Sequence, residues 1–142
     1  MILEKLNKKH FFQPIFEILD QLSFTKDTIT FSEFENWIDT FPSNQHIFIL
    51  ENDFREIIGM GTIVVESKII HSFGKVGHIE DIIISEKYRG KGFGTFLVKN
   101  LVKIAKEEFN VYKVILNCSE MNLPFYKKCG LDIHGIQMGT YF

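Results

Sequence analysis

One segment, Gly77 to Gly94, constrains the fold of this chain more than any other. It begins with a run of β-branched apolar residues that is interrupted only by Glu80 and Asp81, and such runs favour a buried strand. Three glycines at alternate positions follow, and they are Gly90, Gly92 and Gly94. Apolar residues then recur at helical spacing, so the segment predicts a strand, a glycine-rich turn and the start of a long helix.

The glycine-rich turn is typical of a site for a phosphate group. A helix N-terminus exposes unpaired N–H groups and about half a positive charge, and glycine lets an anion approach the backbone. Arg89 and Lys91 add positive charge beside it. The alternative is an ordinary turn between a strand and a helix, because glycine is common in all turns.

The spacing of the glycines distinguishes between phosphate-binding patterns. The dinucleotide pattern G-x-G-x-x-G fails because Thr95 stands where the third glycine belongs. The P-loop pattern fails because Lys91 precedes Gly92 instead of following it. The pattern R/Q-x-x-G-x-G/A fits, with its fixed positions at Arg89, Gly92 and Gly94.

Five motifs, in their order and spacing, resemble those of the GNAT family of N-acetyltransferases: GHIEDI, YRGKGFG, YKVILNC, EMN and FYKKCG. More narrowly, they are similar to the members that acetylate D-glucosamine 6-phosphate with acetyl-CoA and release CoA. The similarity is strong from about Lys68 to Gly130 and weak before Glu51. It implies an enzyme that makes N-acetyl-D-glucosamine 6-phosphate for UDP-N-acetylglucosamine biosynthesis.

Length and composition fit a single domain over residues 1–142. No apolar run approaches the ~20 residues of a membrane span, and no signal-peptide pattern opens the chain. The formal net charge of −2 gives no reason to expect nucleic acid. Cys118 and Cys129 fit no metal spacing, so we expect no metal, and reduced thiols in a cytoplasmic protein.

The remaining patterns predict an α/β fold. We expect a helix over 10–22, and a second that starts at the capping box Thr30-x-x-Glu33, buries its aromatic residues and stops before Pro42. A long helix follows Gly94, and Asn122 is predicted to cap a further, short helix. Strands are expected over 2–6, 46–51, 57–66, 79–84, 111–117 and 133–142. This order matches the acyl-CoA N-acyltransferase fold that the resemblance implies, with a mixed, mostly antiparallel central sheet and helices on both faces.

Within the predicted strand 57–66, Gly59 and Gly61 suggest a bulge or a close approach of two backbones.

The resemblance assigns acetyl-CoA to the glycine-rich turn and to the strand before it. Its pantetheine arm is expected to run along that strand like an added strand. The residues implied in cofactor binding are Ile82, Ile83, Ile84, Arg89, Gly90, Lys91, Gly92, Phe93, Gly94, Asn122 and Tyr126.

Tyr126 is the candidate general acid for the departing thiolate. The pKa of a phenol, about 10, is close to that of an aliphatic thiol, so the proton transfer is nearly balanced. By position alone, Tyr126 is equally well a half-buried tyrosine on an amphipathic helix; the resemblance favours the catalytic role. Asn117 stands where resembling enzymes have an acid, and an amide cannot take a proton. We therefore expect Glu80 to act as base through a water, or the amine to bind already neutral.

Glu80 and Asp81 are adjacent on a strand, so their side chains are expected on opposite faces, where they cannot cooperate. The resemblance places Glu80 at the amine of the sugar and Asp81 at its hydroxyls. A solvated acid pair at a strand edge is the alternative.

The resemblance implies further substrate contacts from Lys68, His71, Tyr112 and Lys113, with Lys113 the best candidate for the phosphate. The near-terminal arginine of the resembling enzymes has no counterpart in this chain. A homodimer is implied, with both subunits contributing residues near the sugar, and no nucleic acid or membrane partner is expected.

Two other functions stay open. Asn117 and the missing arginine favour an acetyltransferase for another amine, such as a peptide N-terminus or a polyamine. A CoA-binding module without catalysis is the second, and the intact Tyr126 argues against it.

Overall fold

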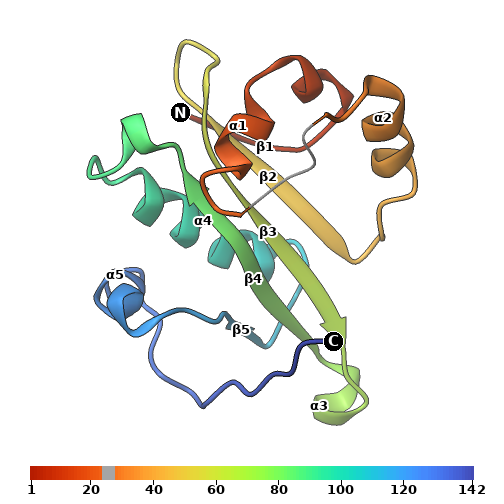
Figure 1. Cartoon of the computed structure of the whole chain (residues 1–142). Helices are drawn as coiled ribbons and strands as arrows, with labels where there is room; N and C mark the ends of the chain where they lie inside the picture. The colour runs from red at the N-terminus through yellow and green to blue at the C-terminus, as the bar shows by residue number, and fades with distance from the viewer. Residues whose placement is uncertain (24–27) are drawn as a thin grey trace.

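The structure is a computed structural model that describes residues 1–23 and 28–142. Its strands are β1 (Ile2–Lys5), β2 (Gln45–Glu51), β3 (Ile57–Ser67), β4 (Lys75–Ile84) and β5 (Lys113–Ile115). They form one five-stranded sheet in the order β1-β2-β3-β4-β5 (Figure 1). Neighbours from β1 to β4 are antiparallel, and β5 pairs parallel with β4. The predicted mixed, mostly antiparallel sheet is confirmed.

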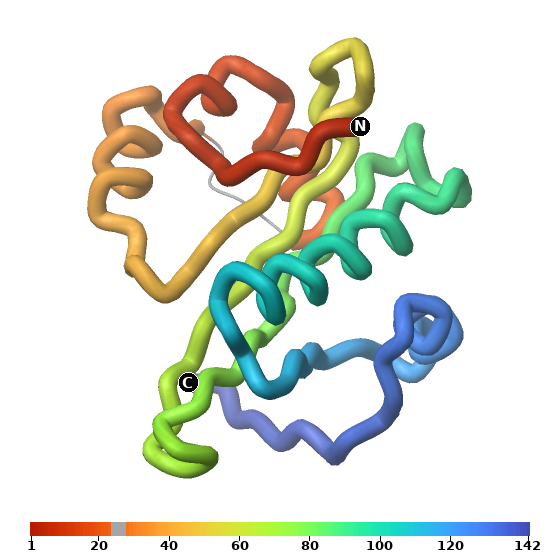
Figure 2. Tube along the Cα trace, turned by 180° about the vertical axis from the view of Figure 1, so that it is seen from behind, coloured from red at the N-terminus to blue at the C-terminus, as the bar shows by residue number. Residues whose placement is uncertain are grey.

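Helices cover both faces of this sheet (Figure 2). The long helix α4 (Phe93–Glu107) lies along one face, and α1 (Ile15–Leu19) and α2 (Phe31–Asp39) lie over the other. A short helix, α3 (Ile70–Phe73), occupies the β3–β4 turn, and α5 (Leu123–Lys128) packs against α4. Within the described residues, no helix has the length and apolar character needed to cross a bilayer.

Alternation along the strands divides the apolar core into two layers. In β2, Phe48 and Leu50 pack with α4, whereas Ile49 between them packs with α1. Leu97 and Leu101 of α4 are fully buried in the first layer. The sheet is therefore fixed from both sides, and its strand ends carry the candidate site.

The helix predicted over 10–22 is divided in two. A 3₁₀ helix, Lys8–Phe12, is followed by α1, which starts after Pro14. Proline disfavours helical dihedrals in the residue before it, and Gln13 is indeed extended, with φ −112° and ψ 164°. Pro14 therefore ends the first piece as well as starting the second.

The capping box of α2 is confirmed. The backbone N–H of Glu33 donates to Thr30 Oγ1 at 3.3 Å, and the Glu33 carboxylate accepts from the Thr30 N–H at 2.9 Å. Burial of its aromatic residues is confirmed only for Phe34, which is 3% exposed, because Phe31 and Trp37 keep 37% and 43% of their surface in solvent.

The strand predicted over 133–142 is wrong. Residues 131–142 have no regular secondary structure and are mostly exposed, and β5 itself is shorter than the predicted 111–117. Gly135 and Gly139 interrupt the apolar pattern of this segment, and glycine weakens a strand. The protein thus presents apolar side chains such as Ile136 and Met138 to solvent.

The irregularity predicted at Gly59 and Gly61 is confirmed. Met60 pairs with Ile83 and Thr62 pairs with Glu80, so two residues of β4 oppose Gly61 alone. This is a β-bulge in β4. The approach is also close, since a Cβ on Gly59 would lie 2.6 Å from the carbonyl oxygen of Ile83.

We expect Gly59→Ala to lower the free energy of unfolding by about 3 kcal/mol, at the upper end of the usual cost of overpacking, because a backbone oxygen cannot move aside. Gly77→Ala is the matched control, since its new methyl group would meet Ala105 and Val111 at 3.4–3.6 Å, which is ordinary contact. Urea unfolding of both variants measures the difference. Equal effects would contradict the close approach.

Candidate active site

β4 and β5 separate towards one end of the sheet (Figure 1). They pair only through Val76–His78 and Lys113–Ile115, although β4 continues to Ile84. In the part of the chain that the structure describes, residues 79–84 of β4 therefore have no strand partner on the β5 side. An extended ligand can pair with this edge as an added strand would.

The glycine turn lies at the end of this opening and leads into α4. Gly92 is the N-cap of α4, with a φ of 85°, and Gly90 has a φ of 75°. No side chain caps the helix, and a Cβ on either glycine would meet nothing within 4 Å. The free N–H groups and the open space beside them fit a phosphate or pyrophosphate group.

Two cations flank the turn, as the sequence predicts. Arg89 Nε donates to the carbonyl oxygen of Ile84 at 2.9 Å, and the Arg89 guanidinium also reaches Gln21 Oε1 at 3.4 Å. Lys91 Nζ donates to the carbonyl oxygen of Lys87 at 3.2 Å. Both side chains are thus attached to the turn while they remain exposed to a ligand.

Tyr126 lies on α5, which packs against the start of α4. A Cβ on Gly94 would meet the Phe125 ring at 3.2 Å, so glycine at this position allows α5 to approach the turn. Burial raises the pKa of Tyr126, and the Cys118 and Cys129 thiols and the Glu80 carboxylate raise it further. The phenol therefore keeps its proton at neutral pH and can donate it.

The alternation predicted for Glu80 and Asp81 is wrong, because the bulge interrupts it. Asp81 has a φ of 52°, and its side chain lines a cavity of about 400 Å³ together with Thr62. Glu80 pairs with Thr62 in the strand register, so both acids lie on the face that α1 and α2 cover. The cavity is otherwise mainly apolar, with residues of α1 and α2 in its wall.

The candidate substrate residues form two groups. Lys68 pairs with Glu66, which also contacts His78 at 2.9 Å. His71 lies on Tyr112, with ring centroids 4.4 Å apart, and Lys113 Nζ is 5.8 Å from the centre of the Tyr112 ring. Lys68, His71 and Lys113 thus lie around the α3 end of the sheet.

The second group contains Glu80 and Asp81. Lys113 pairs with Val76, and Glu80 follows four residues later along β4, which corresponds to about 13 Å of strand. Lys113 and Glu80 of one chain are therefore not direct neighbours, and they lie towards different parts of β4.

Asn117 and Asn122 are both exposed near Tyr126 in the chain. Asn117 lines, with Tyr126, a groove of about 860 Å³ between β5 and residues 130–137. Asn122 occupies the N-cap position of α5, but its side chain makes no capping hydrogen bond. The cap predicted for Asn122 is thus positional only, and its amide remains open to a ligand.

Sequence reasoning missed Gln21. Its Oε1 accepts from the Glu86 backbone N–H at 2.8 Å and from Arg89, both more than sixty residues away in the chain. No spacing pattern links such distant positions, so the sequence alone holds no signal for this contact.

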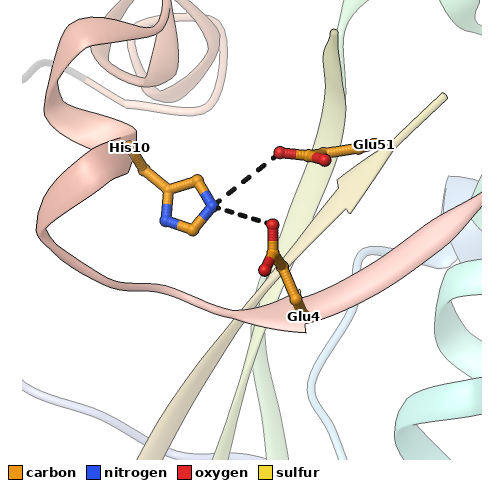
Figure 3. Close-up of side chains that lie close together, drawn as sticks. All are labelled: Glu4, His10 and Glu51. Carbon is orange, nitrogen blue, oxygen red and sulfur yellow. Dashed lines mark hydrogen bonds and ion pairs between the residues drawn. The ribbon is translucent and has the colours of Figure 1, made fainter. Parts of the chain in front are cut away.

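A separate cluster joins Glu4, His10 and Glu51 (Figure 3). Their ligand atoms lie within 4.8 Å of one another, and His10 is fully buried. However, the Asn7 backbone N–H donates to His10 Nδ1 at 2.9 Å, which leaves the proton of a neutral imidazole on Nε2, facing the two carboxylates.

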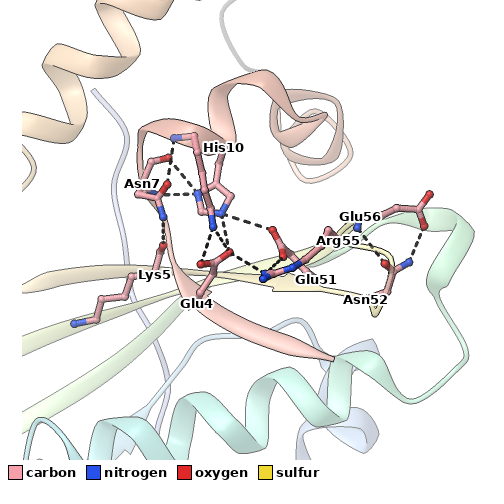
Figure 4. A network of polar contacts seen from close by, with 9 residues as sticks. Glu4, Lys5, Asn7, His10, Glu51, Asn52, Arg55 and Glu56 are labelled. Carbon is pink, nitrogen blue, oxygen red and sulfur yellow. Dashed lines mark hydrogen bonds and ion pairs between the residues drawn. The ribbon is translucent and has the colours of Figure 1, made fainter.

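The charges of this cluster are also balanced. Lys9 pairs with Glu4 at 2.8 Å. Arg55 pairs with Glu51 at 2.9 Å (Figure 4). A metal ligand must offer a lone pair, but Nε2 carries the proton of the neutral imidazole, and each carboxylate already has a cationic partner. The cluster therefore fits a structural hydrogen-bond network better than a cation site. The absence of a metal requirement stays a prediction.

Fold and site together define a sheet with two diverging strands, a glycine turn that fits a phosphate group and a tyrosine that keeps its proton. Residues 11–131 match the model of the acetyltransferase (GNAT) family. The chain belongs to this family of N-acetyltransferases.

The names of its relatives also state a substrate. The chain is 43% identical over 112 residues to the glucosamine 6-phosphate N-acetyltransferase of Candida albicans. This match covers 79% of this chain and 74% of that protein. It is 37% identical over 130 residues to the enzyme of that name from Arabidopsis thaliana, with 89% and 86% covered. The crystal structure of glucosamine-6-phosphate N-acetyltransferase from Arabidopsis thaliana superposes with a TM-score of 0.90 at 33% identity, over 99% of this chain and 97% of that one.

Proposed function

We propose that this protein transfers the acetyl group of acetyl-CoA to the amine of D-glucosamine 6-phosphate, giving N-acetyl-D-glucosamine 6-phosphate for UDP-N-acetylglucosamine biosynthesis. The observation that carries the proposal is the 37–43% identity to proteins of that name over most of the chain. The diverging strands, the glycine turn and Tyr126 support it, because each fits one need of acetyl transfer.

The glycine turn and β4 are the proposed holders of acetyl-CoA, which supplies a thioester-activated acetyl group. The N–H groups at the start of α4, with Arg89 and Lys91, would hold the pyrophosphate. The backbone of Ile82 to Ile84 would pair with the pantetheine arm. Asn122 offers a free amide next to α5.

Tyr126 is the proposed general acid. Its raised pKa keeps the phenol protonated, as donation to the leaving thiolate requires. Asn117 cannot take the proton of the amine, which leaves Glu80, through a water, or an amine that binds neutral. Asp81 would accept hydrogen bonds from the hydroxyls of the sugar.

A homodimer completes the proposed site. Lys68, His71, Tyr112 and Lys113 lie at the α3 end of the sheet, and a second subunit would bring such phosphate-binding residues to the sugar at Glu80. The exposed apolar residues of 131–142 and of α3 support an interface of this kind, since large exposed apolar areas mark association surfaces. Ile69, Phe73 and Ile136 are 86%, 79% and 95% exposed.

Free-thiol release from acetyl-CoA tests the substrate. We expect release with glucosamine 6-phosphate and much slower release with unphosphorylated glucosamine, because the cations would recognise the phosphate. Peptide N-termini and spermidine are the comparison amines. Release with one of those amines and none with the phosphosugar would overturn the substrate, while leaving the use of acetyl-CoA intact.

Tyr126→Phe is expected to lower kcat by about a hundredfold and to leave the Kd for CoA nearly unchanged, because only the proton donor is lost. Glu107→Ala, at an exposed carboxylate at the far end of α4, is the control. Since burial raises the pKa of Tyr126, its contribution should persist through neutral pH and be lost only above the ordinary phenol value of about 10. Unchanged turnover in Tyr126→Phe would remove it from this role.

Mixing two inactive variants tests the shared site. If Lys113 serves the partner's Tyr126, a heterodimer of Lys113→Ala and Tyr126→Phe has one intact site and one with both defects. Random association of equal amounts should then restore about one quarter of wild-type activity, because about half of the dimers are mixed. No recovery after co-refolding, with dimers confirmed by light scattering, would place both residues in one chain's site.

A further inference from the structure

An exposed carboxylate from the β2–β3 turn reaches the start of the glycine turn. Tyr88, the residue immediately before Arg89, donates its phenolic hydrogen to Glu56 Oε2 at 2.5 Å. Asn52 Nδ2 donates to the same oxygen at 2.6 Å. The hydrogen bond from Tyr88 is the largest of the effects that lower the pKa of Glu56, so the carboxylate is ionised at neutral pH.

The ring of Tyr88 contacts residues on both sides of the glycines. Lys87 Nζ and Lys91 Nζ lie 4.8 Å and 5.4 Å from its centre, and Phe93, the first residue of α4, packs edge-on with centroids 6.2 Å apart. The position of this ring therefore affects where the turn begins and where it joins the helix.

The β2–β3 turn holds Glu56 through hydrogen bonds of Asn52 (Figure 4). The backbone N–H groups of Phe54 and Glu56 donate to Asn52 Oδ1 at 2.9 Å and 3.0 Å, an arrangement that fixes a tight turn. Arg55 in the same turn donates to the buried Glu51 at 2.9 Å. Glu56 is thus attached through its own turn to the sheet.

The glycines of the turn make few contacts of their own. Gly90 and Gly92 have positive φ and no neighbours at their Cβ positions, so their backbone is intrinsically free. Gln21 holds Glu86 and Arg89 from α1's side, and Glu56 holds Tyr88 from the sheet's side. Binding to a turn that is already ordered costs less entropy than binding to one that must be ordered first.

We propose that Glu56 is a positioning residue that acts through Tyr88 to pre-order the glycine turn for CoA. It touches neither the acetyl group nor the amine, so it should affect affinity for the carrier and not the chemical step. This inference rests on the proposed use of acetyl-CoA, and CoA binding by the wild-type protein tests that premise separately.

Calorimetric titration with CoA and steady-state kinetics test the proposal. Glu56→Ala and Tyr88→Phe should each raise the Kd for CoA and the KM for acetyl-CoA by about tenfold, with kcat within about twofold of wild type, as expected for lost pre-organisation. Glu56→Gln should lose less, because its amide oxygen can still accept from Tyr88. Glu107→Ala, which removes an exposed carboxylate from the far end of α4, is the control.

The double variant separates positioning from a general loss of stability. If Glu56 acts through Tyr88, Glu56→Ala combined with Tyr88→Phe should bind CoA no more weakly than either single variant. Additive losses, or a lowered unfolding temperature without any change in the Kd for CoA, would overturn the proposal. Failure of the wild-type protein to bind CoA would instead overturn the proposed function.

Discussion

The close approach of β3 to β4 at Gly59 and Gly61 is the constraint on which the candidate site depends. Because two residues of β4 oppose Gly61, β4 carries an extra residue at Asp81, and the bulge turns Asp81 to the same face as Thr62. The β4 residues after the bulge are those proposed to pair with the carrier. The glycines of β3 therefore shape the candidate site although they lie outside the turn before α4.

A path of polar contacts connects the buried Glu51 to the glycine turn. Glu51, which is 1% exposed, is held between His10 and Arg55, and Arg55 belongs to the turn that carries Glu56. A buried carboxylate is costly to leave unpaired, so its network fixes the β2–β3 turn firmly. Glu56, in the same turn, accepts a hydrogen bond from Tyr88 and so connects the β2–β3 turn to the glycine turn. An exposed, glycine-rich segment thus gains order from charges buried on another strand.

Local patterns predicted local structure well. The glycine turn, the start of α4 and the Thr30 capping box depend on residues a few positions apart, and all three are present. The errors come from interactions between distant segments. The bulge at Asp81 depends on how β3 pairs with β4, and the contact of Gln21 with Arg89 spans 68 residues. The sequence was enough to name candidate residues of the site. The distance between Lys113 and Glu80 along the sheet became known only from the register of β4 and β5.

In the proposed reaction, Tyr126 and Glu80 decide where the protons come from and where they go. Tyr126 keeps its proton because burial raises its pKa, so before transfer it cannot serve as the base that takes a proton from the amine. Asn117 has no basic group, whereas β4 supplies the carboxylates of Glu80 and Asp81. Glu80 lies close enough to Tyr126 to raise its pKa, which fits the proposal that Glu80 acts as base through a water unless the amine binds neutral. Its negative charge has a second effect, because it disfavours the tyrosinate and so keeps the acid protonated for the step that follows.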